Sequence, residues 1–88
     1  MNTYLVPLGN RGCWKIFGQD KSKKMFSITF FTSEDPRGKT KEEIEKRYLI
    51  LYRDLKNMHQ ALKLLGKVPL PKTKRGCKKM LKELLCVN

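Results

Sequence analysis

Residues 40–66 constrain the fold more than any other stretch of this chain. Their apolar side chains recur at alternating steps of four and three residues, which places them on one side of an α-helix. These side chains belong to Ile44, Tyr48, Leu51, Leu55, Met58, Leu62 and Leu65. The spacing predicts a single helix roughly 37 Å long, at ~1.5 Å per residue, that backs the rest of the domain. The same spacing also allows a self-associating coiled coil.

Both ends of this stretch carry helix-boundary signals. Thr40 and Glu43 have the spacing of a capping box, in which the hydroxyl and the carboxylate each accept a hydrogen bond from a backbone amide. Gly66 can adopt the left-handed conformation that ends a helix, and Pro69 follows it closely. We therefore predict one helix that begins after Thr40 and ends before Gly66.

The first third of the chain has the alternation of β-strands. Residues 3–8 are mostly apolar but contain Pro7, which suits an edge strand because proline donates no ladder hydrogen bond. Residues 13–18 and 25–32 alternate in side-chain type, and the polar residues 19–24 join them as a hairpin. One face of this sheet collects Trp14, Ile16, Phe26, Ile28 and Phe30.

Together these patterns predict an α+β fold of the order β-β-β-α, a three-stranded antiparallel sheet covered on one face by the long helix. A turn at residues 35–38 links the sheet to the helix. The helix covers the aromatic face, because residues 40–66 supply the only long apolar stripe. The opposite face stays uncovered and presents Lys15, Phe17, Ser27, Thr29 and Phe31.

The last quarter of the chain differs in composition. Residues 67–88 contain seven basic residues and one acidic residue, so they carry +6 of the net charge of +12. A connector with prolines leads to a short basic helix that Thr73 can cap and that ends near Val87. We divide the chain into a β-β-β-α domain, residues 1–66, and a basic connector with a C-terminal helix, residues 67–88.

A net charge of +12 on 88 residues points to an anionic partner, because self-repulsion on this scale costs stability. Nucleic acid is the leading candidate, with DNA favoured over RNA. A solvated charge run is the alternative explanation, but the net charge exceeds what solubility requires. Membrane binding is disfavoured, because the C-terminal helix is short and has no Trp or Phe on its apolar side.

The basic and hydroxyl side chains fall into two predicted contact groups. A β-ribbon can enter the major groove, where Arg, Ser and Thr reach base edges, whereas lysines gain affinity by releasing counterions from phosphates. The candidate base contacts are Arg11, Lys15, Ser27 and Thr29. The candidate phosphate contacts are Lys21, Lys23, Lys24, Lys74, Arg75, Lys78, Lys79 and Lys82.

Catalysis, cofactors and metal binding are not expected from this sequence. His59 is the only histidine, and no nucleophile motif or Gly-rich phosphate loop is present. Cys13, Cys77 and Cys86 are scattered rather than grouped at zinc-ligand spacing, so we expect reduced thiols that act as small apolar residues. The chain has no secretion signal and no apolar run of bilayer length, which favours a cytoplasmic or nuclear protein.

Part of the chain resembles two families of small DNA-binding domains. The resemblance covers roughly residues 4–56 and rests on three segments: Trp14-Lys15-Ile16, residues 25–32 and Thr40-Lys41-Glu42-Glu43. This part of the chain is similar to the plant ethylene-response-factor domains and to the arm-site-binding N-terminal domains of tyrosine recombinases. In those families a three-stranded sheet lies in the major groove and a helix backs it. The resemblance thus implies contacts from Arg11, Lys15, Ser27 and Thr29.

Two function classes remain open from the sequence. The first is a small nucleic-acid-binding protein, such as an accessory factor of a phage or mobile element. The second is a protein-interaction factor or inhibitor that docks on an acidic surface or occupies the nucleic-acid site of another protein. A ribosome-associated protein that binds RNA is a variant of the first class. All three share one electrostatic cause, so composition does not separate them.

Overall fold

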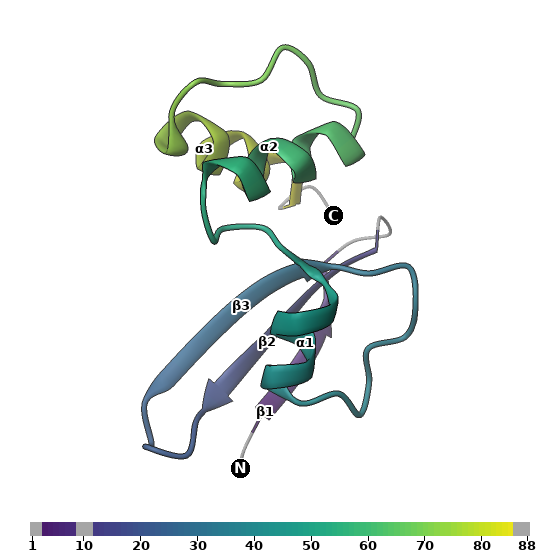
Figure 1. The fold of residues 1–88 in the computed structure, drawn as a ribbon, viewed down its shortest axis with the longest axis vertical. Coiled ribbons are helices and arrows are strands. Elements are labelled where there is room, and N and C mark those ends of the chain that lie inside the picture. Colours follow the sequence, from purple (N-terminus) through teal and green to yellow (C-terminus); the bar gives the residue numbers. More distant parts are fainter. Residues whose placement is uncertain (1–2, 9–11, 86–88) are drawn as a thin grey trace.

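A computed structural model describes residues 3–8 and 12–85 of this chain (Figure 1). Its elements, in chain order, are β1 (Thr3–Pro7), β2 (Cys13–Gln19), β3 (Met25–Phe31), α1 (Lys41–Arg47), β4 (Leu49–Ile50), α2 (Leu55–Leu64) and α3 (Lys74–Leu85). The fold is α+β, as predicted, but the antiparallel sheet has four strands and the described residues form three helices.

The sheet is an antiparallel meander in the order β1-β2-β3-β4. Ile16 of β2 lies opposite Leu5 on one side and Ile28 on the other, so all three point to the same face. The predicted aromatic face is therefore confirmed in its register, with Trp14 opposite Phe30. The predicted polar hairpin between residues 19 and 24 is also present, since β2 and β3 pair directly across it.

The prediction of one continuous helix over residues 40–66 is wrong. The capping box forms, because the Glu43 amide donates to Thr40 Oγ1 at 3.2 Å and the Thr40 amide donates to Glu43 Oε1 at 3.3 Å. The helix nevertheless ends at Arg47. The next five residues, 48–52, are all apolar or aromatic, and in a helix they would point in every direction rather than to one face.

These residues extend the sheet instead. Ile50 pairs with Phe30 across β4 and β3, and the Leu51 amide donates to the Thr29 carbonyl oxygen at 2.9 Å. Burial is the driving force, because Ile50 and Leu51 are only 8% and 0% exposed. The four-three spacing of apolar residues was thus real, but it spans two short helices and the strand between them.

A second helix start follows the strand. Asp54 caps α2, since its carboxylate accepts a hydrogen bond from the Asn57 amide at 2.8 Å. The Asn57 side chain in turn donates to the Ile50 carbonyl oxygen at 2.8 Å, which ties the helix start to β4. At the far end Gly66 has φ +75°, the left-handed conformation predicted for it.

Two apolar clusters hold the structure together. In the first, α1 covers one sheet face through Ile44, which packs with Ile16 and Phe30, while Tyr48 stacks on Phe30 with ring centroids 5.4 Å apart. The second lies between α2, α3 and the adjoining end of the sheet. Its buried members are Cys13, Leu51, Met58, Ala61, Leu62, Cys77 and Leu81. Figure 1 shows α2 and α3 packed side by side beyond that end of the sheet.

The C-terminal helix begins where the sequence predicts. Thr73 precedes α3, and its hydroxyl accepts a hydrogen bond from the Gly76 amide at 3.1 Å. Cys77 of this helix and Cys13 of β2 are free, buried thiols of the second cluster, and burial raises the pKa of Cys13 to about 11. Both pack as small residues of this apolar cluster, and the Cys77 thiol also donates to the Pro71 carbonyl oxygen at 3.4 Å. Cys86 lies outside the described residues. Within residues 3–8 and 12–85, no helix is long and apolar enough to cross a bilayer.

Replacement of Asp54 distinguishes a broken helix from a continuous one, because the free energy of unfolding should change in opposite directions in the two cases. We expect Asp54→Ala to lower the free energy of unfolding by about 1 kcal/mol, because the α2 cap is lost. In a continuous helix the same change would stabilise by up to about 0.7 kcal/mol, since alanine is the better helix former. Urea denaturation measures the difference, and Asp54→Asn, which keeps a capping oxygen, is the matched control.

Candidate nucleic-acid interface

One face of the sheet is only partly covered. α1 packs on the other face, while α2 and α3 cover this one at its end, through Cys13 and Phe31. The remainder, which we call the open face, belongs to neither apolar cluster. It consists of Tyr4 and Val6 of β1, Lys15 and Phe17 of β2, and Met25 and Ser27 of β3.

Two aromatic rings lie at the centre of the open face. Tyr4 and Phe17 are direct cross-strand partners, and their rings stack with centroids 5.5 Å apart and planes 28° apart. Tyr4 is 57% exposed and Met25, on the same face, is 72% exposed. The ammonium group of Lys15 lies 5.5 Å from the centroid of the Phe17 ring, within the range of a cation–π contact. The open face therefore combines aromatic surface with a positive charge.

The structure places three of the four predicted base contacts on this side of the sheet, but not with equal access. Lys15 is half-buried beside Phe17, and Ser27 is exposed. Thr29 points to the predicted side but is only 9% exposed, and its carbonyl oxygen pairs with the amide of the buried Leu51. Thr29 has little surface left for a ligand. Arg11 lies outside the described residues.

Three predicted phosphate contacts occupy the turn between β2 and β3. Lys21, Lys23 and Lys24 are all exposed. The Asp20 carboxylate orders this turn, because it accepts hydrogen bonds from the Ser22 hydroxyl at 2.7 Å and from the amides of Ser22 and Lys24. The Ser22 hydroxyl is the largest of the interactions that lower the pKa of Asp20. The lysines thus project from an ordered turn at one end of the sheet.

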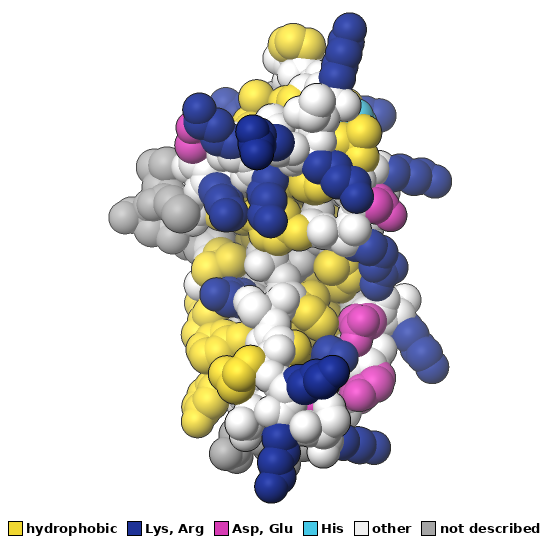
Figure 2. Space-filling model, turned by 90° about the vertical axis from the view of Figure 1, so that its left-hand side faces the viewer, with side chains coloured by type: hydrophobic (Ala, Val, Ile, Leu, Met, Phe, Trp, Pro, Cys, Tyr) yellow, Lys and Arg dark blue, Asp and Glu magenta, His cyan; other side chains and the backbone are white. Residues whose placement is uncertain are grey.

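The other predicted phosphate contacts lie on α3, at the opposite end of the sheet. Its exposed cations are Lys74, Arg75, Lys78, Lys79 and Lys82. In the described part of the chain, three ion pairs form: Arg37 with Asp35, Lys41 with Glu45, and Arg47 with Glu34. None of them uses a cation of α3 or of the β2–β3 turn. Figure 2 shows Lys and Arg side chains over the upper, helical part of the molecule and hydrophobic side chains gathered over the sheet below.

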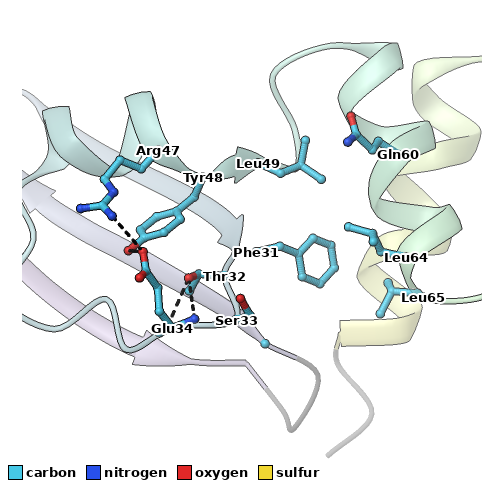
Figure 3. A pocket seen from close by; sticks show the side chains of 11 residues that line it. Phe31, Thr32, Ser33, Glu34, Arg47, Tyr48, Leu49, Gln60, Leu64 and Leu65 are labelled. Atoms are coloured by element: carbon cyan, nitrogen blue, oxygen red, sulfur yellow. Dashed lines mark hydrogen bonds and ion pairs between the residues drawn. The ribbon is translucent and has the colours of Figure 1, made fainter.

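A separate pocket of about 700 Å³ lies between α2 and the end of the sheet (Figure 3). Its charged groups already bind each other, since Glu34 accepts a hydrogen bond from the Tyr48 hydroxyl at 2.8 Å and pairs with Arg47 at 3.4 Å. The rest of the wall combines apolar side chains, such as Leu49 and Leu64, with the uncharged polar side chains of Thr32, Ser33 and Gln60. Among the described residues, no three His, Cys, Asp or Glu side chains gather as metal ligands. The pocket therefore offers a ligand no unpaired charge.

Comparisons with known proteins do not supply a relative. No protein-family model, no curated protein and no solved structure matches this chain. The resemblance to ethylene-response-factor and recombinase arm-site domains therefore stays a prediction, and the interface is argued from this structure alone.

Sequence reasoning placed Phe17 on the uncovered side but did not count Tyr4 or Met25 among the contacts. The available signal was alternation in residues 3–8, which puts Tyr4 and Val6 on the same side of β1. Alternation does not say which side of β1 joins which side of β2. That depends on the pairing of Tyr4 with Phe17, which the sequence does not state.

The contact between Tyr48 and Glu34 predicts a tyrosine hydroxyl that loses its proton at a higher pH than usual. Burial, and then the hydrogen bond to the Glu34 carboxylate, raise the pKa of Tyr48 above its usual 10.0. A raised pKa in the folded state means that this stabilisation is full below pH 10 and is lost as the pH rises through the folded pKa. In an ultraviolet pH titration, Tyr48→Phe should remove a step whose pKa lies above 10.0. Removal of an ordinary step near pH 10 would contradict the contact.

Proposed function

We propose that this chain is a small nucleic-acid-binding protein, with DNA as the expected polymer. In this proposal the cations of α3 and of the β2–β3 turn bind phosphates, and the open face meets the bases. The observation that supports it best is the row of exposed cations on α3 that lacks acidic partners in the described structure. Phosphates would supply the missing counter-charge.

The arrangement of the α3 cations strengthens this argument. Arg75 and Lys79, and likewise Lys78 and Lys82, stand four residues apart on the helix, so like charges are neighbours on its surface. Each such pair costs helix stability in the free protein. A polyanion bound along α3 would place negative charge beside these cations and so turn their repulsion into a net attraction. Affinity would then fall steeply with salt, because released counterions drive the binding.

The opposite side of the molecule is less suited to a polyanion. α1 carries Glu42, Glu43 and Glu45 among its seven residues. In Figure 2 the acidic side chains of the lower part lie on the side away from the hydrophobic patch, where Lys and Arg side chains surround them. Charge is nevertheless distributed unevenly: the three acids of α1 are balanced by Lys41, Lys46 and Arg47, whereas α3 carries five cations and a single acid, Glu83. This asymmetry favours one binding side.

Salt dependence tests the proposal. If about five phosphates are neutralised on duplex DNA, log affinity should fall with log salt concentration with a slope of about −4.5. The double variant Lys78→Gln, Lys82→Gln should reduce the steepness of the slope by about 1.8, at ~0.9 per phosphate contact. Fluorescence anisotropy at several salt concentrations gives both slopes.

The control removes the same charge elsewhere. Lys39→Gln, Lys46→Gln changes two cations that lie near or on α1, and it should leave the slope close to that of the unchanged protein. A flat salt response of the unchanged protein would reject nucleic-acid binding. Equal losses in the two double variants would mean that only net charge matters, and not the surface of α3. Capture of an acidic protein that persists after nuclease treatment would favour the protein-interaction alternative.

A further inference from the structure

The open face has more aromatic surface than phosphate binding requires. We infer that the stacked pair of Tyr4 and Phe17 is a platform on which unpaired bases stack, so that the preferred ligand is single-stranded nucleic acid. This inference rests on the proposed function and specifies its ligand. The pair lies on the part of this sheet face that α2 and α3 leave uncovered.

The two rings differ from the structural aromatics of this chain. Trp14, Phe26 and Phe30 lie on the other face and pack in or against the apolar cluster under α1. Tyr4 and Phe17 pack against neither cluster, and Tyr4 keeps 57% of its surface exposed. A cross-strand aromatic pair does strengthen the pairing of β1 with β2. That role does not account for the exposed Met25 on the same face, whereas an apolar binding surface would include it.

Unpaired bases fit this surface better than a duplex does. In a duplex the base faces stack on one another, and only base edges are accessible in the grooves. The open face offers few groups for base edges, since Lys15 and Ser27 are its accessible predicted contacts and Thr29 is buried. Aromatic rings stack on any unpaired base, regardless of its sequence.

The cations are placed to guide the strand across the rings. Lys21, Lys23 and Lys24 lie in the turn at one end of β2 and β3, and α3 lies beyond the other end (Figure 1). Lys15, between them, holds its ammonium group against Phe17. Phosphates held at both ends would draw the intervening bases over the open face. Positive grooves that track the backbone past stacked aromatics are the usual design of single-strand binders.

An oligonucleotide without bases separates stacking from charge. The probes are a labelled 12-mer of thymidine, an abasic deoxyribose-phosphate 12-mer, a 12-mer of uridine and a 12-base-pair duplex, all measured by anisotropy at one salt concentration. A 12-mer falls within the ~4–16 nucleotides that a single-strand-binding fold covers. We expect the thymidine 12-mer to bind about a hundredfold more tightly than the abasic one, at about tenfold for each of the two rings. Comparison of thymidine with uridine identifies DNA or RNA as the source of the strand.

Variants of the two rings assign the effect to the platform. Phe17→Leu and Tyr4→Leu should each weaken thymidine binding about tenfold and leave abasic binding unchanged. Tyr4→Phe, which keeps the ring, is the matched control and should bind like the unchanged protein. Thermal unfolding checks that each variant is folded. If Phe17→Leu unfolds, Tyr4→Leu still decides the question, because Tyr4 is mostly exposed.

Failure of this inference is distinct from failure of the proposed function. Equal binding of the thymidine and abasic 12-mers, or unchanged binding in both leucine variants, overturns the platform even where Lys78→Gln, Lys82→Gln weakens every probe. Tighter binding of the duplex than of the single strands overturns it as well. No binding of any probe rejects both.

Discussion

The structure depends on the hydrogen-bonded return of the chain to the sheet after α1. Ile50 pairs with Phe30, and the Leu51 amide binds the Thr29 carbonyl oxygen. This pairing buries Leu51 and Phe30 completely, and each such side chain contributes about 1.5–3 kcal/mol when removed from water. A continuous helix would satisfy its own backbone groups equally well. It would turn part of residues 48–52 toward solvent, whereas the observed structure buries Ile50 and Leu51 and half-buries the other three, and that difference decides the local structure.

The break in the helix also decides which surfaces the sheet keeps. Because the chain turns at residues 48–54, α1 stays short and covers only one face through Ile44. α2 then starts beyond β4, packs with α3, and closes the other face only at the end that holds Cys13 and Phe31. The rest of that face stays open, and α3 directs its cations outward beside it. One local choice thus separates α1, whose charges balance, from the proposed binding side.

Local patterns predicted the parts of this fold that local interactions determine. The alternation in β2 and β3 assigned Trp14 and Phe30 to one face and Lys15 to the other, and the capping box at Thr40 formed as expected. The prediction of one long helix failed because of a contact between residues that are distant in the sequence. Its four-three periodicity extended across a strand whose partner, Phe30, lies twenty residues earlier in the sequence. The run of five apolar residues, followed by Asp54 as a helix cap, was the signal against it.

In the candidate site, too, local patterns predicted only the features that depend on residue type and strand period. Composition and alternation predicted exposed cations and an uncovered face, because both follow from residue type and strand period. The aromatic pair of Tyr4 and Phe17 depends on strand register, and the burial of Thr29 depends on the tertiary position of Leu51. Neither is encoded in a local pattern. The most specific part of the proposed interface therefore became visible only in three dimensions.

Amide chemical-shift mapping tests the central claim most directly, because it locates the ligand without a substitution. On titration of the ¹⁵N-labelled protein with a thymidine 12-mer, we expect the largest shifts at Tyr4, Lys15 and Phe17, with a second group along α3. Shifts concentrated on α1, or around Leu64 in the pocket beside α2, would contradict the account.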